Sequence, residues 1–407
     1  MSFRHDYSVL RECFDLNRER VELPNSHIAI TTSWFESAAV PLLPGTSHYQ
    51  CAKHDRVFLD DTFVPGPLVT DEARMCLPDV AVTENQRFRI AVFTDSRQQR
   101  NTGAILMLHG LNERTWYKYL PWAKRLVETT GKAVILFPIA FHMNRAPDTW
   151  GQARLMKQVS GRRQAQSPTI VNSTFANAAI STRLQENPQR FCWSGLQTIE
   201  DIAQLINEIR ADLYAPIARD AKVNIFAYSI GAFLAEILLM ANVGQHFTNT
   251  RLFMFCGGAT VDRMYPNSRY ILDSDATIAL HALFLSRLPN ELQQGPRLGH
   301  YISRAHSEGQ AFRWLLSYHE NKFEREARLR QLAAQVAATV LRKDNVVPPS
   351  EVFSALQGEA RDIPINVGVL DFPFEYSHVA PFPLNAPEAD LSRGFDQVFQ
   401  AAAAHLG

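Results

Sequence analysis

Short, continuous runs of apolar residues recur along the chain from residue 104 onward, separated by longer stretches of mixed polarity. A run without alternation is typical of a strand buried on both faces of a sheet, as parallel strands are. We therefore predict buried strands at 104–108, 133–137, 223–228, 251–256, 338–341 and 365–370. Extended runs at 57–59 and 88–93 predict shorter strands before them.

The stretches between these runs carry helical patterns. Helices are predicted from about residue 115 to Gly131, over 198–212, over 231–242 and over 389–405. Gly131 stands where a left-handed helix cap is expected. Strands that alternate with helices imply right-handed crossovers. The chain is therefore predicted to be of the α/β class, with a mostly parallel central sheet covered by helices on both faces.

Two long segments interrupt this alternation. Residues 139–197 form a polar excursion, and residues 259–336 read as several helices inserted between two strands. Long insertions in compact domains are usually functional lids or caps. We predict an N-terminal extension of unclear structure over 1–57, a core in two parts over 58–258 and 337–407, and a helical cap over 259–336.

Charge and composition exclude several classes of protein. The chain has 407 residues, with 41 Lys and Arg against 41 Asp and Glu, so its net charge is zero. That balance lacks the basic excess a nucleic-acid binder needs, and 46% hydrophobic residues exclude a disordered chain.

No apolar run approaches the ~18 residues that span a bilayer. The charged N-terminus does not read as a signal peptide, so we expect a cytoplasmic protein without stable membrane insertion; the oligomeric state stays open.

The five cysteines are odd in number and widely spaced, which favours a reduced, intracellular protein. Cys51 and His54 form a CxxH pair, and Cys76 is the candidate for a third metal ligand. No fourth ligand is evident at matching spacing, so no metal site is predicted. There is no P-loop and no GxGxxG after a strand, so no cofactor is predicted either.

The strongest chemical signal is the segment Phe226–Gly231, which joins a predicted strand directly to a predicted helix. A serine in such a turn, here Ser229, is held at the edge of the sheet with its hydroxyl exposed, and small neighbours let strand and helix approach. The usual pattern is GxSxG, and Ala227 takes the place of the first glycine. The alternative is an ordinary loop serine that caps the helix.

A second turn follows the first clear strand, at Leu108-His109-Gly110-Leu111. Backbone N–H groups at such a turn and just after a nucleophile can bind the oxyanion of an attacked carbonyl. We predict that Leu111 and Ile230 supply these two groups. The alternative is that His109 and Gly110 only make a tight turn.

An acid and a base follow downstream in the required order. Asp344 comes directly after the predicted strand 338–341, where a catalytic carboxylate belongs. His378 follows the last predicted strand, so the order is Ser229, Asp344, His378. Asp371 and Glu375 lie near His378 in sequence and are alternative orienting acids.

Together these four segments resemble the α/β-hydrolase superfamily over about residues 85–405. The resemblance implies a nucleophile at Ser229, a general base at His378, an orienting acid at Asp344 and an oxyanion hole at Leu111 and Ile230. It also implies that the insertion 259–336 is the cap that this family often carries.

Three further groups of side chains are predicted to have surface or packing roles rather than catalytic ones. Four histidines of the excursion and cap are expected to be surface or core residues rather than catalytic groups: His142, His281, His300 and His306. An aromatic cluster is expected to pack helix against sheet rather than line an acyl pocket: Trp116, Tyr117, Tyr119 and Trp122. Three arginines are read as a solvated face rather than an anion site: Arg154, Arg162 and Arg163.

We therefore predict a serine hydrolase that cleaves a carboxylic ester or thioester of a small-molecule acyl substrate. An acyltransferase would use the same triad with a second substrate in place of water. A binding protein on an inactive hydrolase scaffold is less consistent with an intact Ser, Asp and His. A lipase acting at a membrane surface lacks the expected basic amphipathic helix.

Overall fold

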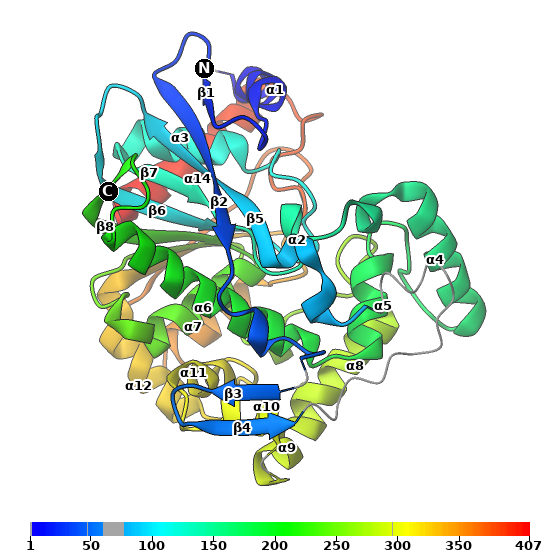
Figure 1. Ribbon diagram of the computed structural model, residues 1–407. Coiled ribbons are helices and arrows are strands. Elements are labelled where there is room, and N and C mark those ends of the chain that lie inside the picture. The colour runs from blue at the N-terminus through cyan, green and yellow to red at the C-terminus, as the bar shows by residue number, and fades with distance from the viewer. Residues whose placement is uncertain (1, 47, 60–76, 295) are drawn as a thin grey trace.

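The computed structural model describes residues 2–46, 48–59, 77–294 and 296–407, and a nine-stranded mixed sheet runs through its centre (Figure 1). Cys76 lies outside the described residues. The strands, in their spatial order, are β1 (Arg20–Glu22), β2 (Ile28–Glu36), β5 (Arg87–Asp95), β7 (Ala133–Leu136), β6 (Asn101–Leu108), β8 (Ile217–Tyr228), β9 (Leu252–Phe255), β10 (Val336–Leu341) and β11 (Asn366–Leu370).

The sheet is mostly parallel, as the sequence predicts. Strands β7, β6, β8, β9, β10 and β11 pair in parallel, whereas β5 pairs antiparallel with both β7 and β2. The chain leaves β6 for β7 on one side and later returns to β8 on the other. Open parallel sheets bind ligands at the carboxyl edge of such a reversal, which directs attention to the ends of β6 and β8.

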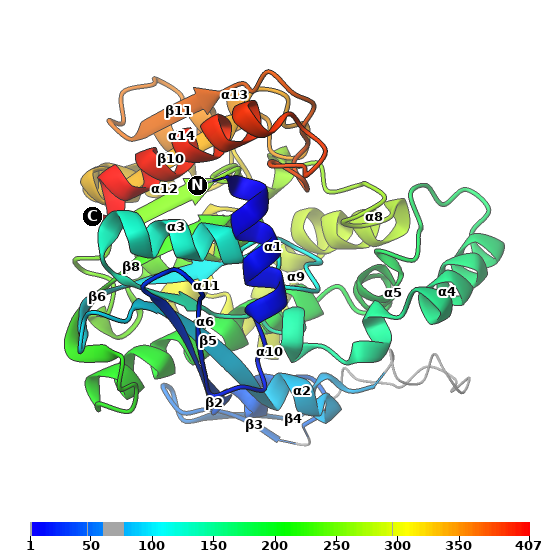
Figure 2. The same ribbon diagram turned by 90° about the horizontal axis from the view of Figure 1, so that it is seen from above.

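Helices cover both faces of this sheet (Figures 1 and 2). One face carries α3 (Leu120–Thr130), α14 (Glu388–Leu406) and α1 (Phe3–Cys13), and the other carries α6 (Arg190–Arg210) and α7 (Ile230–Ala241). In β6, Leu106 and Leu108 belong to the hydrophobic cluster of the α6 and α7 face. Ile105 and Met107 belong to the cluster of the α3 and α14 face. Both faces of the strand are buried, which is why its sequence is continuously apolar.

Two predicted helices differ from the structure in where they begin. Helix α3 begins at Leu120 rather than near residue 115. It ends at Thr130, and Gly131 caps it in the predicted left-handed conformation, with φ 66°. Helix α6 begins at Arg190 rather than 198, since the last residues of the excursion continue the same helix and bury Cys192, Trp193 and Leu196.

Residues 1–57, which show no clear period, contribute α1 and two strands of the sheet. Strand β2 pairs with β5 along its whole length. A separate hairpin follows, made of β3 (His48–Cys51) and β4 (Arg56–Leu59).

The two long insertions are helical. The excursion holds α4 (Ala153–Gln166) and α5 (Ala178–Glu186), and α5 packs on α8 (Ser274–Ala282) of the second insertion. The other helices of that insertion are α9 (Leu288–Gln294), α10 (Arg297–Tyr301), α11 (Ser307–Trp314) and α12 (Lys322–Leu332). Two further helices are α2 (Thr83–Gln86) and α13 (Pro349–Gln357). Within the described ranges, none of the helices has the length and apolar character needed to cross a membrane.

Candidate active site

Three side chains from separate parts of the sequence form one hydrogen-bonded chain at the carboxyl edge of the sheet. The Oγ of Ser229 lies 2.7 Å from Nε2 of His378. The Nδ1 of His378 lies 2.7 Å from Oδ2 of Asp344. All three residues are buried, so these hydrogen bonds are shielded from water.

Ser229 occupies a strained turn between β8 and α7. Its φ of 56° and ψ of −121° are rarely adopted by a residue with a side chain. Strain of this kind persists only where the surroundings fix it, and it clusters at functional sites. A Cβ on Gly231 would lie 2.7 Å from the carbonyl oxygen of His109, so only glycine lets α7 approach the end of β6. Ala227 still fits in the first small position and is fully buried.

Asp344 is fixed by several donors. Its Oδ1 accepts hydrogen bonds from the backbone N–H groups of Val346 and Val347, both at 2.9 Å. Burial and the adjacent Asp344 carboxylate raise the pKa of the Cys256 thiol well above its usual range, so Cys256 stays protonated and donates to Asp344. The carboxylate is thereby oriented toward His378.

The two alternative acids contact other groups. Asp371 accepts a hydrogen bond of 2.8 Å from the hydroxyl of Tyr376, and Glu375 is exposed beside Lys343. Of the three carboxylates considered from the sequence, Asp344 is therefore the one that the fold brings to His378.

His378 is held from a second side by Tyr228. The Tyr228 hydroxyl donates to the backbone carbonyl of His378. The two rings stack with centroids 5.6 Å apart and an angle of 19° between their planes. Because Tyr228 precedes Ser229, one turn of the chain positions both members of the Ser–His pair. A buried tyrosine at the end of a strand carries no distinguishing sequence signal, so sequence reasoning assigned no role to Tyr228 or Cys256.

Several hydrogen bonds hold the turn after β6 in place. The Nδ1 of His109 lies 2.8 Å from the carbonyl of Gly110, and its Nε2 accepts from the N–H of Ile139 at 2.9 Å. Burial, together with the nearby His142, lowers the pKa of His109 well below its usual range, so the ring is neutral. The Gly110 N–H donates to the hydroxyl of Tyr119 at 2.9 Å. His109 thus shapes the turn rather than taking part in proton transfer.

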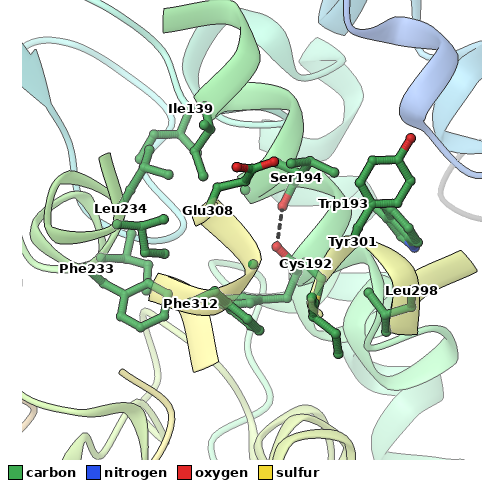
Figure 3. A pocket seen from close by; sticks show the side chains of 18 of the residues that line it. Ile139, Cys192, Trp193, Ser194, Phe233, Leu234, Leu298, Tyr301, Glu308 and Phe312 are labelled. Atoms are coloured by element: carbon green, nitrogen blue, oxygen red, sulfur yellow. Dashed lines mark hydrogen bonds between the residues drawn. The ribbon is translucent and has the colours of Figure 1, made fainter. Parts of the chain in front are cut away.

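Leu111 and Ile230, the two predicted oxyanion donors, lie beside Ser229. All three residues line one narrow cavity of about 50 Å³. Leu111 and Ile230 also line a neighbouring cavity of about 80 Å³, whose walls are almost entirely apolar. Figure 3 shows side chains of α6, α7, α10 and α11 gathered around this second cavity, among them Phe233, Leu298 and Phe312. The site therefore combines a reactive hydroxyl with an adjoining apolar space.

The four histidines predicted to be surface or core residues divide into two groups, those that line the cavities and those that lie elsewhere. His142 lines the apolar cavity, and burial lowers its pKa to about 4, so it is neutral. His281 lines the narrow cavity beside Ser229. His300 and His306 lie together with Cys51 and His54, in a cluster that includes none of Ser229, His378 and Asp344.

The arginine and aromatic candidates have structural contacts. Arg163 forms a buried ion pair with Asp273, so it does not belong to a solvated face. Trp116, Tyr119 and Trp122 are buried in the cluster between α3 and the sheet, which confirms the packing interpretation.

Three solved structures to which the chain is similar carry hydrolase names. A thermostable esterase from Pseudomonas putida has 9% identity and a TM-score of 0.41, over 100% of this chain and 91% of that one. Carboxyl esterase 2 from the fungus Tuber melanosporum has 10% identity and a TM-score of 0.43, over 79% and 82%. A peroxisomal alpha-beta-hydrolase from Saccharomyces cerevisiae has 11% identity and a TM-score of 0.37, over 93% and 90%. Similarities this low assign no function.

Sequence comparison identifies a family instead. Residues 1–407 match the model described as a family of unknown function (DUF6051). No curated protein matches the sequence.

Proposed function

The chain belongs to the DUF6051 family along its whole length, and we propose that it is an α/β-hydrolase that cleaves a carboxylic ester or thioester. The observation that carries this proposal is the hydrogen-bonded chain from Ser229 through His378 to Asp344, set at a strained strand-to-helix turn. The reversal of strand order next to this turn is a further support.

In the proposed mechanism, Nε2 of His378 takes the proton of the Ser229 hydroxyl as Oγ attacks the acyl carbonyl. Asp344 holds the imidazole in place and stabilises the imidazolium that forms. His378 then gives its proton to the leaving alcohol or thiol, and an acyl-enzyme remains on Ser229. Water attacks this ester with His378 again as the base, which releases the acid and restores the serine.

The negative charge on the carbonyl oxygen needs donors during both steps. We assign this role to the backbone N–H groups of Leu111 and Ile230, which border the same cavity as Ser229. Loss of one such donor typically costs about 3–4 kcal/mol of transition-state stabilisation. The His109 hydrogen bonds keep the first of these turns in place.

The apolar cavity of about 80 Å³ is the proposed acyl site. Its size and lining suit a small apolar acyl group rather than a polar or charged one. Helices α10 and α11 supply part of its wall, so the segment 259–336 acts as the cap over this site. Phe191 borders both cavities.

The test is turnover of p-nitrophenyl esters and of matched thioesters of increasing acyl length. Wild-type protein should hydrolyse them with a preference for short chains, and Ser229→Ala should lose about 10⁴-fold or more in kcat. Ser96→Ala is the matched control, because Ser96 is an exposed turn residue. Retention of turnover in Ser229→Ala would reject the proposed nucleophile.

A further inference from the structure

Four potential metal ligands converge where the N-terminal hairpin meets the second insertion. Cys51 is the last residue of β3, and His54 lies in the turn between β3 and β4. His300 lies in α10, and His306 directly precedes α11. One ligand atom from each of the four side chains lies within 4.8 Å of the other three. Cys51, His300 and His306 are buried, whereas His54 is exposed.

Three of the separations between these atoms are close to those around a tetrahedral ion. The Sγ of Cys51 lies 3.4 Å from Nδ1 of His54 and 3.4 Å from Nε2 of His306. The Nε2 atoms of His306 and His300 lie 3.2 Å apart. A tetrahedral Zn²⁺ with ordinary Zn–S and Zn–N bonds holds such pairs about 3.3–3.6 Å apart.

The surroundings of the cluster also suit a metal. Nδ1 of His306 lies 2.8 Å from Oε1 of the buried Glu308, which leaves Nε2 facing Cys51 and His300. A carboxylate on the far nitrogen is the usual partner of a metal-bound histidine, since it fixes the ring and raises its basicity. The hydroxyl of Tyr301 hydrogen-bonds Cys51, as a donor to a thiolate sulfur would.

We propose that Cys51, His54, His300 and His306 bind one Zn²⁺ ion in a closed, four-coordinate structural site. One thiolate with three imidazoles is a ligand set that suits Zn²⁺. On binding, the Cys51 thiol loses its proton to solvent, and the three histidines bind as neutral rings. No position is left open for water or substrate, so the ion takes no part in ester cleavage.

The site ties together segments that the sequence keeps far apart. It joins the β3–β4 hairpin to α10 and α11, and both helices line the proposed acyl cavity through Leu298, Tyr301 and Phe312. Metal binding should therefore fix the position of these helices over that cavity. The CxxH pair was visible in the sequence, but the other two ligands come from a distant insertion whose packing the sequence does not reveal.

The first experiment measures metal content and ligand type directly. Wild-type protein, purified without chelators or a histidine tag, should contain about one zinc per chain by mass spectrometry of its metals. After chelation and addition of Co²⁺, the wild type should show intense visible bands of a tetrahedral ion and a thiolate-to-cobalt charge-transfer band. A protein that neither retains zinc nor gives this cobalt spectrum would overturn the proposal.

Substitutions of Cys51 and His54 test whether these residues are metal ligands. Cys51→Ser should abolish the charge-transfer band, with Cys13→Ser, at a partly exposed cysteine of α1, as its matched control. His54 is exposed, so His54→Ala should leave the fold intact while weakening Co²⁺ binding about 10-fold or more. The control for it is His27→Ala, at another exposed histidine. Equal zinc content and equal cobalt affinity in His54→Ala and His27→Ala would contradict the assignment. These readouts do not involve ester turnover, so they stand or fall independently of the proposed function.

Discussion

The carboxylate beside His378 is the residue on which the proposed mechanism depends most after the nucleophile. Asp344 receives two backbone N–H groups and the imidazole, whereas Asp371 is bound to Tyr376 and lies near Arg342. The structure thus distinguishes two aspartates that the sequence left as alternative partners of His378.

We expect Asp344→Asn to lower kcat roughly 10⁴-fold, because an amide favours the wrong tautomer of His378. KM should change little, since Asp344 does not border the cavities described above. Steady-state kinetics with the best p-nitrophenyl ester measures both constants. The matched control, Asp371→Asn, should stay close to wild type; a similar loss in both variants would contradict the role given to Asp344.

At the scale of secondary-structure elements, helix α7 packs against α12, and this contact buries a carboxyl group. Glu236 of α7 is 3% exposed, and burial raises its pKa to about 8, which the nearby Arg325 of α12 only partly opposes. An unburied glutamate has a pKa of 4.5. The folded protein therefore keeps a proton on Glu236 that the unfolded chain releases across this window.

The contribution of Glu236 to stability should be fully present below pH 4.5 and fall as the pH rises to about 8. Glu236→Gln mimics the protonated carboxyl, so it should gain stability relative to the wild type across that window. Melting temperatures at both ends of the window measure the difference. A difference between variant and wild type that is independent of pH would refute the assignment.

An element is easier to predict when its buried residues form a regular apolar pattern in the sequence. Five of the six predicted core strands are buried on both faces along nearly all of their predicted residues, so their apolar runs locate them within a few residues, although β8 begins well before its predicted start, at Ile217. The sixth, β11, lies at the edge of the sheet and is only partly buried, although a buried strand was predicted there. Strand β2 went unrecognised because Thr31, Thr32 and Ser33 interrupt its apolar positions. The start of α6 was missed because Ser194 and Gly195 interrupt the apolar pattern there, although Cys192, Trp193 and Leu196 are buried in the same helix.

At the scale of the whole molecule, the two insertions are joined by a buried ion pair. Arg163 of α4 contacts both carboxylate oxygens of Asp273, at 2.6–2.9 Å, just before α8. Asp273 also accepts from the N–H of Ala276 and so caps α8. One aspartate therefore fixes both the start of a helix and the contact between the excursion and the segment 259–336.

Asp273→Asn should lower the free energy of unfolding by about 3–5 kcal/mol, because it leaves the buried Arg163 charge without its partner. Asparagine still caps the helix, so the loss reports the ion pair. Urea unfolding followed by circular dichroism measures it. Asp275→Asn, at a partly exposed neighbour in α8, is the control, and equal stability of the two variants would contradict the account.

The long-range contacts between functional residues were predictable only where those residues directly follow the ends of predicted strands. Ser229 and Asp344 each follow a recognisable buried strand, and His378 follows the last one, so their convergence could be expected. The cluster of Cys51 and His54 with His300 and His306 depends on how a hairpin packs against an insertion. No periodicity or spacing encodes that contact.

The central claim is that Ser229 is an activated nucleophile, and a fluorophosphonate probe tests it most directly. Intact mass and peptide mapping of the wild type should show one adduct, on Ser229. Ser229→Ala should show none, while Ser96→Ala should label like the wild type. Absence of labelling in the wild type, or equal labelling of wild type and Ser229→Ala, would contradict the account.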